Sequence, residues 1–130
     1  MLDTSVWGPR ALFALRVVTA LLFLEHATMK FFAFPVGMGD GPLPPLILAA
    51  GAIEIIASLL IIVGFYARIA AFLASGEMAI AYFMAHFPSS FWPAVNKGES
   101  AILFCFIFLY IAAAGAGAWS LDKARAEANA

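Results

Sequence analysis

The feature that most constrains this chain is a set of four long apolar stretches that together cover most of its length. They lie at about residues 9–29, 45–64, 66–86 and 99–118. Since a helix rises about 1.5 Å per residue, about 20 helical residues cross the roughly 30 Å hydrocarbon core of a bilayer. We therefore predict an all-α integral membrane four-helix bundle in which each stretch is one transmembrane helix.

The composition supports a membrane environment. The 130 residues are 65% hydrophobic and 12% charged, and the mean hydropathy is +0.99. A soluble domain has about 25% charged residues, roughly twice as many. The length predicts a single domain over residues 1–130, embedded as a multi-pass protein in a cell inner membrane. A net charge of −1 argues against a nucleic-acid partner, and the lone Cys105 excludes an internal disulfide.

Four crossings place both termini on the same side of the membrane. Positive residues are more numerous at that side than at the other, and cytoplasmic loops carry an excess of Lys and Arg, so both termini are predicted to be cytoplasmic. The side with the termini has Arg10, Arg68, Lys123 and Arg125, and the opposite side has Lys30 and Lys97.

Three ionisable residues fall at similar depth in three different predicted helices: Arg16, Glu54 and Glu77. Each such group costs about 2.5–3.5 kcal/mol or more to insert at the helix centre, so it must pair or line a polar cavity. One interpretation is a buried ion-pair network that locks the helices together. The other is a proton-carrying site in which one carboxyl stays protonated because two carboxylates share one cation. We favour the network.

A second polar cluster is predicted at the outer end of the bundle. We assign His26, His86 and Glu99 as candidate catalytic residues, and Lys30, Asn96 and Glu25 as candidate ligand-binding residues. His26 and Lys30 are four residues apart and share a helix face. The structural alternative is that Glu99 favours the start of a helix through the helix dipole and that the histidines are interfacial hydrogen-bonding residues. With two histidines in the chain, we expect no metal or haem site. The many phenylalanines would suit a quinone ring.

At these residues the chain resembles the DoxX family of four-helix bacterial membrane proteins. The likeness runs in order along nearly the whole chain. It is carried by Leu15-Arg16, Phe23-Leu-Glu-His26 with Lys30, Gly51-Ala-Ile-Glu54, Val63-Gly-Phe-Tyr-Ala-Arg68, Ala81-Tyr-Phe-Met-Ala-His86, Asn96-Lys-Gly-Glu99 and Trp119-Ser-Leu-Asp122. Glu25 and Glu77 depart from the pattern, since the resemblance implies uncharged residues at both places. That departure counts against a proton site that depends on Glu77.

The resemblance implies a role in quinone-linked redox, sulfur or oxidative-stress chemistry, because the family is named from subunits of a thiosulfate:quinone oxidoreductase. We therefore expect an oxidoreductase subunit or accessory protein that works with membrane redox partners, with quinone as its candidate ligand. His26 or His86 would exchange the proton, since imidazole titrates near pH 6.5. Two alternatives stay open: a small proton-coupled transporter acting as a homo-oligomer through Glu54 and Glu77, and a non-catalytic scaffold of a redox complex.

Overall fold

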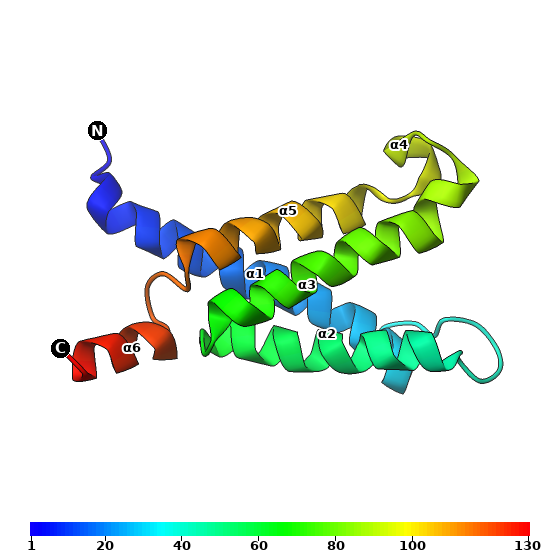
Figure 1. Ribbon diagram of the computed structural model, residues 1–130, viewed down its shortest axis with the longest axis horizontal. Coiled ribbons are helices and arrows are strands. Elements are labelled where there is room, and N and C mark those ends of the chain that lie inside the picture. Colours follow the sequence, from blue (N-terminus) through cyan, green and yellow to red (C-terminus); the bar gives the residue numbers. More distant parts are fainter.

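The computed structural model describes all 130 residues, and its regular elements are all helical (Figure 1). The α-helices are α1 (Thr4–Phe32), α2 (Pro45–Val63), α3 (Ala67–Ala81), α4 (Pro93–Asn96), α5 (Glu99–Ala114) and α6 (Leu121–Ala128). Helix α3 continues through a π-helical turn, η1 (Tyr82–His86), and a 3-10 turn, η2 (Phe87–Ser89). The predicted all-α fold is confirmed.

Three helical segments are long and apolar enough to cross a membrane by length and composition: Thr4–Phe32, Pro45–Val63 and Ala67–Ser89. Helix α5 is also apolar but has 16 residues, which is about 24 Å of helix. The prediction of a helix over residues 99–118 is therefore wrong at its end. The chain leaves the helical conformation after Ala114, because Gly115 and Gly117 adopt positive φ angles of 93° and 74°.

Helix α1 begins earlier than the predicted residue 9. Asp3 caps it, accepting hydrogen bonds from the Ser5 backbone N–H at 2.9 Å and from the Ser5 hydroxyl at 2.6 Å. These bonds hold the pKa of Asp3 below its usual value, the hydroxyl having the larger effect. Pro9, the first residue of the predicted stretch, therefore lies inside the helix.

The helices pack mainly in pairs, α1 along α2 and α3 along α5, with α2 also against α3. Phe23, Ile61, Phe108 and Ile111 are fully buried at the centre. Helix α3 contributes small side chains to this core, which let neighbouring backbones approach closely. These are Ala67, Ala70, Ala71 and Ala74. Large apolar side chains such as Ile56, Phe72 and Phe106 point outward and are more than 60% exposed, as expected of a surface that lipid covers.

Both termini lie at the same end of the molecule, on the left in Figure 1. The connection between α1 and α2 and the short helix α4 lie at the opposite end. We call these the terminal end and the loop end. At the terminal end, α6 is tied to the turn between α2 and α3, because Asp122 accepts from the backbone N–H groups of Tyr66 and Ala67, both at 2.9 Å. The backbone N–H of Asp122 in turn donates to the carbonyl of Gly64 at 2.8 Å.

Candidate functional site

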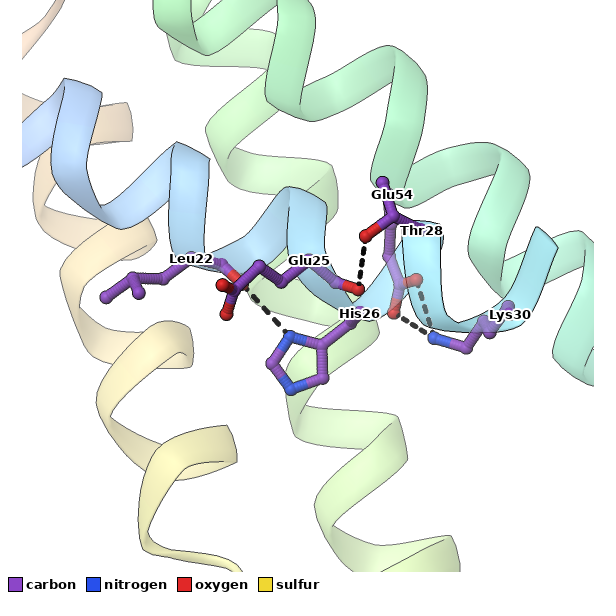
Figure 2. Close-up of polar contacts among 6 residues, drawn as sticks. All are labelled: Leu22, Glu25, His26, Thr28, Lys30 and Glu54. Carbon is purple, nitrogen blue, oxygen red and sulfur yellow. Dashed lines mark hydrogen bonds and ion pairs between the residues drawn. The ribbon is translucent and has the colours of Figure 1, made fainter. Parts of the chain in front are cut away.

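The main polar contact between the long helices joins Lys30 in the last turn of α1 to Glu54 in the middle of α2. The ammonium nitrogen lies 2.6 Å from Oε1 and 2.5 Å from Oε2 of the carboxylate (Figure 2). The two side chains are only 9% and 3% exposed. A buried cation and anion held this closely satisfy one another, whereas either one alone would be an uncompensated charge in a medium of low polarity.

Gly51 explains how this pair can form. It lies one helical turn before Glu54, where α2 faces the end of α1. A Cβ atom at this position would lie 2.7 Å from the Phe31 ring and 3.1 Å from Cδ of Lys30. A Cβ atom this close would force the Phe31 ring to move and would crowd the stem of Lys30, so glycine leaves space for Lys30 to reach Glu54. The Gly51-Ala-Ile-Glu54 sequence is therefore one structural unit.

Glu77 in α3 brings a second carboxyl group to this region. Both of its carboxylate oxygens are buried and neither has a hydrogen-bond partner. No hydrogen bond or ion pair joins it to Glu54 or Lys30, and it interacts with these two groups only through their charges. Three helices thus contribute one amine and two carboxyl groups to what we call the Lys30–Glu54–Glu77 cluster.

Arg16 is not part of that cluster, so the predicted pairing of Arg16 with Glu54 and Glu77 is wrong. Its fully buried guanidinium donates instead to four carbonyl oxygens. These belong to Ile61 and Ile62, both at 2.6 Å, and to Ala118 and Trp119, at 3.3 and 3.1 Å. Both carbonyls lie in the last turn of α2, where a helix leaves carbonyls without a partner four residues on, and the Ile61 carbonyl also accepts from the Gly64 N–H at 3.2 Å.

The predicted pairing is wrong because Arg16 and Glu54 lie at different depths along the helices. Glu54 is seven residues before Ile61 in the same helix, or about 10 Å along its axis. Arg16 therefore lies toward the terminal end, while Lys30, fourteen residues further along α1, lies at the level of Glu54. The cation that faces the carboxylates is Lys30, which the sequence analysis assigned to a ligand-binding pocket.

The structure brings His86 and Asn96 together. The Nδ1 nitrogen of His86 lies 3.0 Å from the Asn96 carbonyl oxygen and donates to it, since a carbonyl can only accept. The side chain of Asn96 donates to the Tyr82 hydroxyl at 3.2 Å and to the Ser90 carbonyl at 2.9 Å, and it accepts from the Gly98 N–H at 2.7 Å. This buried amide is fully used in holding the α3–α5 connection together, which leaves it little capacity to bind a ligand.

The remaining members of the predicted outer cluster lie apart. His26 is exposed on α1, where Nδ1 donates to the Leu22 carbonyl at 3.2 Å, and its ring packs edge-on against Phe104 at 5.6 Å between centroids. Figure 2 shows the imidazole directed away from the Lys30–Glu54 pair. Glu25 and Glu99 are also exposed, and no hydrogen bond or ion pair joins His26 to His86 or Glu99. The single outer pocket predicted from the sequence is thus not assembled.

Comparison with known proteins identifies the family. The family model described as DoxX matches residues 11–87, more than half of the chain. The chain belongs to the DoxX family. It is therefore a membrane protein, and its long apolar helices lie in a lipid bilayer.

A similar protein offers no activity that could be transferred to this chain. The chain is 46% identical over 110 residues to a protein of Haemophilus influenzae that is described as uncharacterized, a match covering 80% of this chain and 82% of the relative. No solved structure matches. The Lys30–Glu54–Glu77 cluster, His26 and His86 fall inside the matched DoxX region, whereas Asn96, Glu99 and Asp122 follow it.

Proposed function

We propose that this DoxX protein crosses a cell inner membrane four times, with α5 as the fourth span and both termini in the cytoplasm. Helix α5 packs extensively against α3 and runs beside it from near the loop end to the terminal end (Figure 1). At about 24 Å it is a few ångströms shorter than the hydrocarbon core, a mismatch that local bilayer thinning accommodates at modest cost. The excess of Arg and Lys at the terminal end supports the cytoplasmic assignment.

We further propose that the Lys30–Glu54–Glu77 cluster holds an exchangeable proton and that the protein is a small proton-coupled transporter. The observation that carries this proposal is Glu77, whose two carboxyl oxygens are buried without any hydrogen-bond partner. Burying an unpaired carboxylate costs several kcal/mol, and Lys30 is already engaged by Glu54. The cluster therefore accommodates Glu77 best with a proton on it.

Release of that proton would change the cluster as a whole. The new Glu77 carboxylate would compete with Glu54 for the one ammonium group, leaving a site with two negative charges and one positive charge. A monovalent cation entering the cluster would restore the balance, which couples cation binding to proton release. Because Phe23, Ile61 and Phe108 fill the centre of one chain, we place the exchange path between two copies of the protein.

The test is proton flux in liposomes that contain the purified protein and a pH-sensitive dye. A gradient of Na⁺ or K⁺ should drive proton movement in the unmodified protein, and Glu77→Gln should abolish it. Glu25→Gln is the matched control, since Glu25 is a carboxylate on the exposed surface of α1. Absence of flux in the unmodified protein, or equal flux in Glu77→Gln, would contradict the transporter proposal.

A second proposal is the quinone-linked redox role of an accessory subunit, and the geometry of His26 favours it. Because Nδ1 of His26 carries the proton that bonds the Leu22 carbonyl, Nε2 is free to accept a hydrogen bond on the exposed side of α1. A quinol dissolved in the bilayer could donate a hydroxyl to Nε2 and stack near Phe104. Oxidation of the bound quinol to a quinone would release two protons, one of them through Nε2, and the two electrons would pass to a partner subunit.

Binding of a short-chain ubiquinol analogue, kept reduced under anaerobic conditions, to the purified protein tests this redox proposal. His26→Ala should weaken binding at least tenfold, whereas His86→Ala should leave it unchanged, because His86 is committed to the Asn96 carbonyl. Failure of the unmodified protein to bind the analogue would rule out a quinone site at His26.

A further inference from the structure

A pocket of about 470 Å³ opens at the terminal end of the molecule, away from the Lys30–Glu54–Glu77 cluster. It lies between the first turn of α3, the connection that follows α5, and helix α6. Its polar lining includes Arg68, Ser120, Asp122 and Lys123, and its apolar lining includes Ile69 and Ala126. Nothing described so far uses this pocket.

The lining of the pocket has a net positive charge, from Arg68 and Lys123 against Asp122. Asp122 is the acidic residue among the lining residues, and both of its oxygens are occupied by the N–H groups of Tyr66 and Ala67. Lys123 has one weak ion pair, 3.8 Å from Glu127, and its side chain is 57% exposed. It is therefore available to an anionic ligand.

Arg68 supplies a second cation, which is held by hydrogen bonds. It donates three hydrogen bonds to the last carbonyls of α5: two from Nη1, to Ala112 and Ala113, and one from Nη2, to Ala114. A guanidinium has five N–H donors, so two remain, one on Nε and one on Nη2. These two donors lie on one edge of the group and match a pair of phosphate oxygens.

The backbone adds further donors. The N–H groups of Ala116 and Gly117, both lining the pocket, make no hydrogen bond within the chain. These N–H groups lie in the turn that follows α5, where Gly117 has a positive φ angle of 74°, and unpaired N–H groups in turns can bind anions. The pocket thus offers two guanidinium N–H donors of Arg68, the ammonium group of Lys123 and the unpaired backbone N–H groups of Ala116 and Gly117.

The surroundings point to a lipid as the source of the anion. The pocket lies where the long helices end, and its wall includes Tyr66 and Ile69, which are 50% and 61% exposed. Inorganic phosphate would leave these apolar side chains exposed, whereas the glycerol and upper acyl chains of a lipid would cover them. Basic pockets between helices at the cytoplasmic side bind anionic headgroups in this way. We propose that this pocket binds the phosphate-bearing headgroup of an anionic phospholipid.

Titration of the purified protein in detergent with phosphatidylglycerol, followed by native mass spectrometry, tests the proposal. Phosphatidylglycerol should remain bound, and phosphatidylcholine or inorganic phosphate at the same concentration should not. Lys123→Gln should weaken phosphatidylglycerol binding about fivefold, the effect of one interfacial lysine. Arg125→Gln is the matched control, because it removes one positive charge from the same helix outside the pocket and should have little effect.

A steric variant separates the pocket from surface charge in general. Ala126→Trp fills the pocket without changing any charge and should weaken phosphatidylglycerol binding as well. Equal weakening by Lys123→Gln and Arg125→Gln, or unchanged binding in Ala126→Trp, would overturn the pocket assignment. Equal binding of inorganic phosphate would overturn the lipid assignment. None of these outcomes depends on whether Glu77 carries a proton.

Discussion

Two basic side chains of α1 are buried in different ways. Arg16 uses backbone carbonyls at the end of α2 and in the segment after α5, so its charge is spread over four acceptors and no carboxylate is needed. Lys30 depends on Glu54 alone. A guanidinium suits the first environment because its several donors point in different directions, and a compact ammonium suits the second.

This difference predicts a strong coupling between Lys30 and Glu54. Lys30→Met leaves the Glu54 carboxylate buried without its partner and should cost about 3–5 kcal/mol of stability. Glu54→Leu should cost a similar amount. The double variant, which replaces the pair with apolar side chains, should recover most of the loss. Denaturation of the four proteins in the same detergent measures the coupling, and additive losses would show that the pair contributes little.

The candidate site could be predicted only in part, for reasons visible at particular residues. That Glu54 and Glu77 lie near one another followed from counting depth along the spans, since a carboxyl at helix centre must find a partner. The acceptors of Arg16 could not be predicted, because they are backbone atoms of residues far apart in sequence and carry no side-chain signal. The role of Gly51 was likewise visible only in the structure, where its missing Cβ leaves space beside Phe31 and Lys30.

At the scale of elements, the turn between α2 and α3 depends on a side chain from the far end of the sequence. Gly64 adopts a left-handed conformation with φ of 69°, and a Cβ atom there would clash with Cβ of Ser120. Asp122 then caps the first N–H groups of α3. Hydropathy indicated that a short turn joins two helices here, but it could not show that the C-terminal segment closes it.

We therefore predict that Asp122→Ala loosens this turn without unfolding the spans. Loss of a helix-capping side chain typically costs about 1 kcal/mol, and here two N–H groups lose their acceptor. Amide hydrogen exchange of residues 64–68 should accelerate, while exchange in α5 should not change. Glu127→Ala, an exposed acidic residue of the same helix, is the control. Unchanged exchange at residues 64–68 would show that the cap is dispensable.

At the scale of the whole molecule, the limits of α2 agree well with the sequence, whereas those of α1 and α5 do not. An apolar stretch reports where lipid can cover a helix, but a helix continues or stops according to its caps. Asp3 lengthens α1 beyond the first apolar residues. Gly115 and Gly117 end α5 although the following residues are still small and apolar. The length of a helix in this protein is therefore set by the residues at its ends and not by the thickness of the membrane.

Labelling of single cysteines should distinguish a protein with four membrane spans from one with three. Single cysteines introduced by Asp40→Cys, Lys97→Cys and Ala130→Cys, in a background of Cys105→Ser, should be labelled by a membrane-impermeant maleimide in whole cells according to their side. Because the connection after α1 and the connection before α5 share the loop end, the first two positions should be labelled from outside. Position 130 should be labelled only after the membrane is opened, because α5 returns the chain to the terminal end. If α5 lay on the surface instead of crossing, positions 97 and 130 would label together, since no span would separate them.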